Sequence, residues 1–147
     1  MQRKEAVIFE TVYNQIMLLL AKKPRIEVVG LCFGHHDEER IEIRSFKQIE
    51  NLDNSSTSFS LDYEIMYKEI QNHEKKKAIL VGIFHSHPEG VKLYPSQKDL
   101  HYMQYWPYPY LWLIGGTEGG KLSSQLRIFS LLAGEIIEIP YVRMASS

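Results

Sequence analysis

Ala78-Ile79-Leu80-Val81-Gly82-Ile83-Phe84 leads directly into His85-Ser86-His87-Pro88, and Ser96-Gln97-Lys98-Asp99 follows after a short loop. The uninterrupted apolar run is typical of a buried strand, so the two histidines are expected at its C-terminal end. Side chains two residues apart on a strand point to the same face, so both imidazoles face one way. If a turn brings Asp99 to them, the three side chains form a candidate metal site. Three protein ligands leave a coordination position for water, as in catalytic zinc sites.

These residues also have a structural interpretation. Ser96 after Pro95, with an acidic residue three positions later, matches a capping box that opens a helix, and capping alone would explain both Ser96 and Asp99. The two interpretations are compatible, because a capped first turn is rigid and a metal ligand needs a rigid support. The histidine pair has an alternative too, since polar residues commonly emerge where a strand ends.

A hydrolytic metal site also needs a base for the attacking water, normally a carboxylate that is not itself a ligand. Glu27 is the candidate, because it is the one acidic residue in the apolar segment 26–33, where a strand is expected. A charge in an apolar strand is unfavourable unless it serves a function. The alternative is a solvated position at the start of the strand, next to Pro24 and paired with Arg25. The pattern alone does not decide between them.

The rest of the chain predicts an α+β (mixed α/β) fold, with one main mixed sheet flanked by helices. Helical periodicity runs over residues 6–23, with a stop at Pro24, and over residues 61–76, with Ser60 as the N-cap. A polar turn at residues 35–39 joins two strands into a hairpin. The strands are expected at residues 26–34, 40–49, 78–84 and 110–114, a third helix at about residues 97–105, and a terminal hairpin at residues 123–140 turning at Ala133-Gly134.

Composition narrows the classes of function. A length of 147 residues fits a single domain spanning residues 1–147. The net charge is −1 at pH 7, which gives no reason to expect a nucleic-acid or anionic-membrane partner. The lysines at 75–77 are expected to form a solvated helix end.

The lone cysteine, Cys32, excludes an intrachain disulfide and lies in an apolar run. We expect a buried hydrophobic role for it, the alternative being a nucleophile. The sequence shows no signal peptide and no apolar run long enough to cross a bilayer, so a soluble, cytoplasmic protein is expected.

Taken together, the motifs resemble the JAMM (MPN-type) zinc metalloproteases. The family pattern is a glutamate in a Glu-x-x-Gly-x-x-x-Gly strand, then His-x-His-Pro, a loop and Ser-x-x-Asp. Here the upstream element reads Glu27-Val28-Val29-Gly30-Leu31-Cys32-Phe33-Gly34. The resemblance extends over residues 51–62, 100–103 and 111–114, and looks closest to the short single-domain prokaryotic members. The loop between His87 and Ser96 is slightly longer than the usual spacing, which we expect to alter substrate contacts without breaking the site.

The resemblance implies a role for each residue. His85, His87 and Asp99 would bind one zinc ion per chain. Glu27 would take a proton from the attacking water and pass it to the leaving amine, and Ser96 would donate a hydrogen bond to the tetrahedral oxyanion. Ser86 points to the opposite strand face, so only a packing or supporting role is expected for it.

The resemblance also implies a function: zinc-dependent hydrolysis of a peptide or isopeptide bond at the C-terminal tail of a ubiquitin-like or sulfur-carrier protein. An extended, glycine-ended tail can lie beside a sheet edge as an added strand. The alternatives are a non-catalytic MPN-type interaction module and, less favoured, a small-molecule hydrolase with a closed pocket.

Other conspicuous residues receive weaker interpretations. His35 and His36 are expected in a solvated turn, not at a metal, and His101 on a helix would face away from Asp99. A dense aromatic cluster is either a hydrophobic wall around the core or a contact surface for a partner, and the sequence favours neither. Its members are Tyr102, Tyr105, Trp106, Tyr108, Tyr110 and Trp112.

Overall fold

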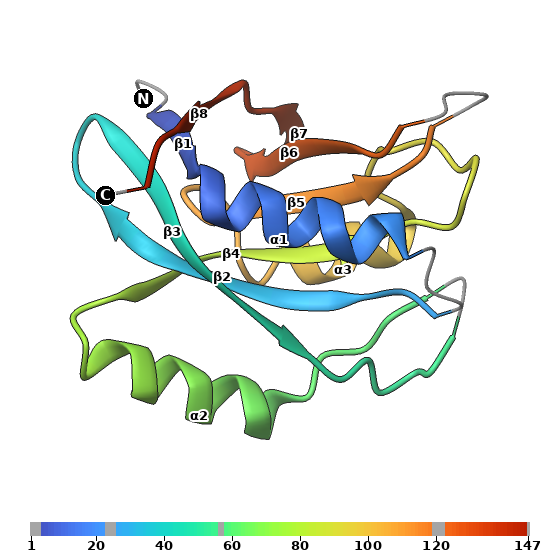
Figure 1. The fold of residues 1–147 in the computed structure, drawn as a ribbon, viewed down its shortest axis with the longest axis horizontal. Helices are drawn as coiled ribbons and strands as arrows, with labels where there is room; N and C mark the ends of the chain where they lie inside the picture. Colours follow the sequence, from blue (N-terminus) through green and yellow to red (C-terminus); the bar gives the residue numbers. More distant parts are fainter. Residues whose placement is uncertain (1–3, 23–25, 56–57, 119–122, 147) are drawn as a thin grey trace.

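The computed structural model describes residues 4–22, 26–55, 58–118 and 123–146, and these form one mixed sheet with three helices (Figure 1). The strand order across the eight-stranded sheet is β7-β6-β5-β4-β2-β3-β1-β8. The elements are β1 (Glu5–Phe9), α1 (Glu10–Ala21), β2 (Val29–His36), β3 (Arg40–Ile49), α2 (Tyr63–Glu74), β4 (Ile79–Ser86), α3 (Gln97–Met103), β5 (Leu111–Gly116), β6 (Gln125–Leu132), β7 (Glu135–Glu138) and β8 (Tyr141–Met144). The mixed α/β architecture expected from the sequence is confirmed.

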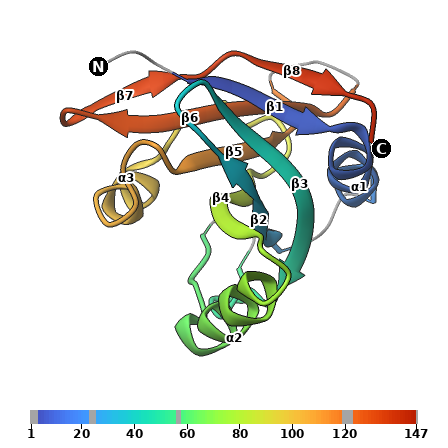
Figure 2. The same ribbon diagram turned by 90° about the vertical axis from the view of Figure 1, so that its left-hand side faces the viewer.

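The sheet is strongly curled, and it separates two hydrophobic cores. Figure 2 shows both edge strands, β7 and β8, along the same side of the molecule. The hydroxyl of Tyr141 on the edge strand β8 donates to the carbonyl of Leu126 on β6, next to the other edge, at 2.7 Å. Helix α1 packs on one face of the sheet, in the core that includes Leu111 and Leu113 of β5. Helices α2 and α3 lie with the other core, which takes the alternate β5 residues, Trp112 and Ile114.

The pairing of the central strands determines where the site is built. Strand β4 runs antiparallel to β2, with His85 opposite Val29, and parallel to β5, with His85 opposite Ile114. The C-terminal end of β4 therefore lies beside the start of β2. This brings the segment before β2, which carries Glu27, next to the histidines although nearly sixty residues separate them in the chain.

The predicted helix over residues 6–23 is wrong in its first part, because Glu5–Phe9 is strand β1. Ala6, Val7 and Ile8 are all fully buried, and β1 pairs in parallel with both β3 and β8. A continuous apolar triplet suits a strand covered on both faces, and the helical pattern begins only at Glu10. Strand β8 follows Pro140 and was not predicted; its pairing partner β1 had itself been assigned to a helix.

Two further predictions need correction. Strand β2 spans Val29–His36 instead of residues 26–34, so Glu27 precedes the strand and the histidines at 35 and 36 end it. The N-cap of α2 is Asp62, whose carboxylate accepts from the backbone N–H groups of Glu64 and Ile65. Ser60, the predicted cap, donates its hydroxyl to Asp53 instead, at 2.6 Å.

Other predictions are confirmed. Strand β3 has the expected bounds, and the terminal hairpin turns at Ala133-Gly134, both with positive φ. Cys32 is fully buried, and burial raises the pKa of its thiol far above the ordinary value. Among the described residues, no helix is long and apolar enough to cross a membrane.

The aromatic cluster mainly forms part of the core wall. Trp112 is 1% exposed, and Tyr102 and Trp106 pack against the same core as α2 and α3. Tyr105 differs, since it is 66% exposed and lies just after α3. The hydrophobic-wall interpretation therefore fits most of the cluster.

Candidate active site

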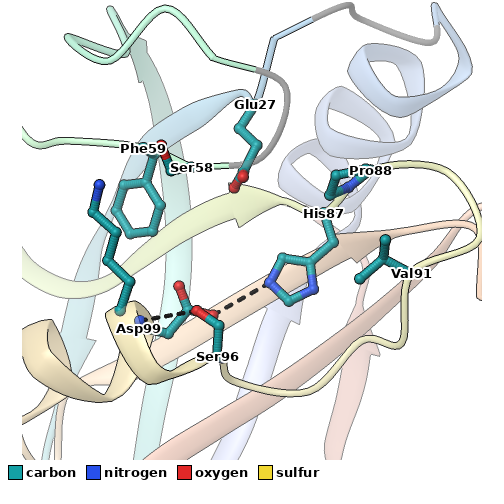
Figure 3. Close-up of a pocket in the computed structure, with 9 residues that line it drawn as sticks. Glu27, Ser58, Phe59, His87, Pro88, Val91, Ser96 and Asp99 are labelled. Atoms are coloured by element: carbon teal, nitrogen blue, oxygen red, sulfur yellow. Dashed lines mark hydrogen bonds and ion pairs between the residues drawn. The ribbon is translucent and has the colours of Figure 1, made fainter.

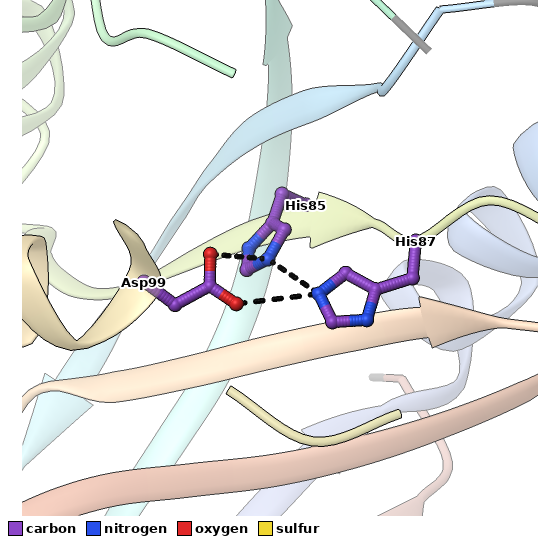
Figure 4. Close-up of side chains that lie close together, drawn as sticks. All are labelled: His85, His87 and Asp99. Carbon is purple, nitrogen blue, oxygen red and sulfur yellow. Dashed lines mark hydrogen bonds and ion pairs between the residues drawn. The ribbon is translucent and has the colours of Figure 1, made fainter. Parts of the chain in front are cut away.

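His85, His87 and Asp99 converge where β4 ends and α3 begins (Figure 4). The Nε2 atom of His85 lies 3.0 Å from Asp99 Oδ1, and that of His87 lies 3.2 Å from Asp99 Oδ2. The two Nε2 atoms are 3.2 Å apart. Two nitrogen lone pairs and a carboxylate oxygen thus point toward one small volume, as the strand geometry predicted for the histidine pair.

The separations between these donor atoms fit a metal ion. Ligand bonds of about 2.0–2.1 Å in a tetrahedral zinc site place the ligand atoms about 3.3 Å from one another. Here His85, His87 and Asp99 each offer one ligand atom, and these atoms all lie within 4.8 Å of one another. His87 is also oriented for the task, because its Nδ1 lies 2.9 Å from the carbonyl oxygen of Lys92. A proton donated there leaves Nε2 unprotonated and free to coordinate. The longer loop after His87 therefore supports the imidazole rather than breaking the site.

Burial determines the charges in the cluster. His85 is fully buried, and burial lowers the pKa of its imidazole, which keeps that ring neutral. Burial would raise the pKa of Asp99, but His85 and His87 outweigh it and hold that pKa well below the usual range. Burial also opposes protonation of His87, yet Asp99 and the Lys92 carbonyl raise the pKa of that ring.

His85 has one further signature. Its Nδ1 is the one buried side-chain polar atom without a hydrogen-bond partner among the described residues. A buried polar atom without a partner costs free energy and is rare in folded proteins, so a functional reason for this ring is expected. Such a neutral ring beside an ionised carboxylate is the N and O donor set that a divalent transition metal prefers.

Glu27 lies across the cleft from these ligands (Figure 3). It is 5% exposed, and its carboxylate points toward His87 in the close-up. The cleft has a volume of about 220 Å³, and Glu27, His87, Ser96 and Asp99 all line it. The predicted alternative, a solvated carboxylate, is therefore wrong for Glu27. Its proposed partner Arg25 lies outside the described residues.

Burial raises the pKa of Glu27 from 4.5 to about 7, with a smaller opposing effect from His87. Between about pH 4.5 and pH 7 the folded protein therefore holds more protons at this site than the unfolded chain, so stability falls as the pH rises. The penalty is fully present above pH 7 and amounts to about 3 kcal/mol.

Replacement of Glu27 by glutamine should remove that penalty. In metal-free protein we expect Glu27→Gln to be more stable than the wild type by about 2–3 kcal/mol at pH 8, and equally stable near pH 4. Urea denaturation of both proteins in chelator, at the two pH values, measures the difference. A gap between the proteins that is the same at both pH values would contradict a buried, reluctantly ionised Glu27.

Ser96 performs the predicted capping and also faces the cleft. Its Oγ accepts from the Asp99 backbone N–H at 3.1 Å, and Asp99 Oδ2 accepts from the Ser96 N–H at 2.8 Å. This is the reciprocal capping box expected from the sequence. The cap uses a lone pair of the hydroxyl and leaves its proton free to donate to another group.

Some cleft residues were not singled out from the sequence. Ser58 and Phe59 line it from the loop before α2, Val91 from the loop after β4, and Lys98 from α3. Phe59 is stacked on the His85 ring, with centroids 4.4 Å apart. The signal for residues 58 and 59 was the family resemblance of that segment. Nothing in their own spacing indicated a position beside the metal ligands.

Comparison with known proteins identifies the class that this geometry defines. Residues 9–128 match the family described as "Prokaryotic homologs of the JAB domain", and the chain belongs to this family. The chain is therefore a JAMM-type protein, as its motifs predicted.

Two curated relatives are named as enzymes. One is the desampylase of Pyrococcus furiosus, 34% identical over 107 residues, which cover 73% of this chain and 71% of that protein. The other is a probable TtuB-protein conjugate cleaving protease of Thermus thermophilus, 31% identical over 122 residues, or 82% and 72% of the two chains. The predicted enzyme class, a JAMM-type peptidase, is the class of both.

A solved structure agrees with the fold. A Desulfitobacterium hafniense protein determined in solution superposes with a TM-score of 0.76 and covers 97% of this chain and 93% of its own. The two sequences are 18% identical, so this likeness concerns the fold alone.

Proposed function

We propose that this protein is a zinc-dependent peptidase that hydrolyses a peptide or isopeptide bond at the C-terminal tail of a ubiquitin-like or sulfur-carrier protein. The observation that carries the proposal is the convergence of His85, His87 and Asp99 within 3.2 Å of one another, with Glu27 in the same cleft. The two enzyme relatives support the substrate class, because their names describe desampylation and the cleavage of TtuB-protein conjugates.

In this proposal His85, His87 and Asp99 hold the zinc ion. When bound, the ion supplies Lewis-acid polarisation of the scissile carbonyl and makes a water molecule more acidic. Hydrogen bonds with neighbouring residues orient two of these ligands. The Lys92 carbonyl orients His87, and the capping box with Ser96 fixes the carboxylate of Asp99.

Glu27 acts as the general base. Its carboxylate takes a proton from the attacking water and later delivers it to the leaving amine. Burial raises the pKa of Glu27, which strengthens the carboxylate as a base for that proton. Ser96 donates its hydroxyl proton to the oxyanion that develops on the substrate carbonyl.

The open cleft fits an extended polypeptide better than a small molecule. Pro88 and Val91 form one of its walls and Ser58 and Phe59 another, with Val91 44% exposed. A tail that ends in glycines has no side chains to keep its last carbonyl away from the ligands and Glu27.

We further propose that residues 1–147 act as one domain and that the reaction takes place in the cytoplasm.

The proposal is tested with zinc-loaded protein and two kinds of substrate from the host. One is a ubiquitin-like protein with a C-terminal extension, and the other is the same protein conjugated to a lysine. Mass spectrometry should locate the cut directly after the terminal glycine of the modifier. Binding without cleavage of either substrate would contradict the peptidase and favour the non-catalytic interaction module.

Replacement of Ser96 tests the oxyanion role. We expect Ser96→Ala to lower kcat by about 100-fold or more, since one lost oxyanion donor has that effect. The lost helix cap should also destabilise the protein by about 1 kcal/mol. Steady-state kinetics measure the first effect and thermal unfolding the second. A variant that loses stability yet keeps its kcat would restrict Ser96 to capping.

A further inference from the structure

The loop between β3 and α2 holds the backbone on which Glu27 stands. Glu27 lies outside every helix and strand of the described residues, so its position depends on loop contacts. Its backbone N–H donates to the carbonyl of Ser55 at 2.7 Å. Its carbonyl accepts from Nδ2 of Asn51 at 3.2 Å. Two residues of one loop thus bind the peptide groups on either side of the Glu27 Cα atom.

Asn51 is the centre of this arrangement. It is 4% exposed, and its amide forms four hydrogen bonds to backbone groups. Nδ2 donates to the carbonyls of Glu27 and Ser58, at 3.2 and 3.0 Å. Oδ1 accepts from the N–H groups of Asp53 and Ser60, at 3.1 and 3.0 Å. A carboxamide offers both donors and acceptors, so one buried side chain shapes the loop and binds it to Glu27.

The outer side of the same loop is fixed to the helix that carries a metal ligand. The Asp53 carboxylate accepts from the hydroxyls of Ser58 and Ser60 at 2.7 and 2.6 Å. It also accepts from Nζ of Lys98 at 2.6 Å. Lys98 immediately precedes Asp99 in α3. The loop therefore spans the two halves of the site, from the Glu27 segment to the first turn of α3.

A second support comes from the opposite side. The hydroxyl of Ser86, between the two histidines, accepts from the Val28 N–H at 2.8 Å. The Ser86 N–H in turn donates to the Val28 carbonyl at 2.9 Å. This is the supporting role expected of Ser86. These two hydrogen bonds hold Val28 against β4. On the other side, the loop 51–60 holds Glu27, and Asn51 is the buried residue that makes this contact.

We propose that Asn51 is a positioning residue, which holds the Glu27 carboxylate at its place in the cleft through the backbone of Glu27 and the loop 51–60. The inference rests on the proposed function, in which Glu27 is the base. Asn51 does not line the cleft, so it acts through Glu27 and not on the substrate. Misplacement of a reacting group by about 1 Å lowers a rate about 100-fold.

Two variants separate the contacts of Asn51. Asn51→Ala removes all four hydrogen bonds. Asn51→Asp keeps the shape and the acceptors but removes the donors to Glu27 and Ser58. The matched control is Ser130→Ala, because Ser130 is fully buried and its hydroxyl donates to the carbonyl of Tyr110, in the contact region of β5 and β6. The control loses a buried bond of the same kind away from the cleft.

We expect both Asn51 variants to lose about 100-fold in kcat, with KM within about threefold of the wild-type value. Both variants should bind zinc as tightly as the wild-type protein. Hydrogen exchange at the Glu27 amide should be at least about tenfold faster in both, because that amide loses its fixed environment. Ser130→Ala should keep the wild-type kcat and the wild-type exchange at Glu27, with a lower midpoint of unfolding.

The readouts distinguish failure of the inference from failure of the proposed function. An unchanged exchange rate at Glu27, or a kcat no lower than that of Ser130→Ala, would overturn the role of Asn51. If the wild type cleaves no substrate, the proposed function fails, and the exchange measurement still decides whether Asn51 holds Glu27. If Asn51→Ala does not fold, the isosteric Asn51→Asp gives the answer.

Discussion

Glu27→Gln should abolish cleavage while leaving the metal in place. Glutamine has the shape of glutamate but cannot accept the proton of the attacking water, so we expect kcat to fall about 10³- to 10⁴-fold, the upper part of the range for a general base. Glu27 makes no contact with His85, His87 or Asp99 among the described hydrogen bonds and ion pairs, so the ligand set is unchanged. Single-turnover kinetics with a conjugate substrate and metal analysis of the same sample measure both effects.

The control is a carboxylate-to-amide change of the same size outside the cleft. Glu10 pairs with Arg143 on the surface, at 2.9 Å, and Glu10→Gln should cleave at the wild-type rate. Normal cleavage by Glu27→Gln would mean that another residue is the base. Loss of zinc from Glu27→Gln would instead mean that Glu27 is a ligand, which the geometry does not suggest.

The local chemistry of the site could be predicted from the sequence because it depends on short-range rules. The two histidines share a strand face as the period of two requires, and Asp99 enters through a capping box visible in four residues. The strand-end and capping interpretations of these residues are compatible with the candidate metal site. The histidines lie at the end of β4 and Asp99 completes the capping box, while the three side chains lie close together.

What the sequence could not predict depends on pairing between distant segments. Strand β1 was taken for helix because its apolar triplet reads equally well in either period, and only its place between β3 and β8 decides the matter. Asn51 is a stronger case. It looks like an ordinary polar loop residue in the sequence, and its importance comes from the Glu27 carbonyl, 24 residues away, to which it donates.

Replacement of a ligand should remove the metal. His87→Ala deletes one of three donors, and Asp99→Asn replaces the ionised oxygen with a neutral amide of the same shape, which can still accept from the Ser96 N–H. We expect each variant to lose zinc affinity by more than about 100-fold, since loss of a ligand's hydrogen-bond partner alone has an effect of 10–100-fold, and to lose cleavage with it. Metal analysis and a competitive chelator titration measure the affinity.

The matched control is a histidine of the same helix. His101 lies two residues after Asp99 in α3, is exposed, and packs its ring against those of Tyr102 and Tyr105. His101→Ala should keep the wild-type zinc content of about one ion per chain. Wild-type zinc content in both His87→Ala and Asp99→Asn would refute the metal site. Loss of zinc from those two variants, with retention in His101→Ala, would assign the ion to the end of β4, where an apolar strand delivers two imidazoles to a capped carboxylate.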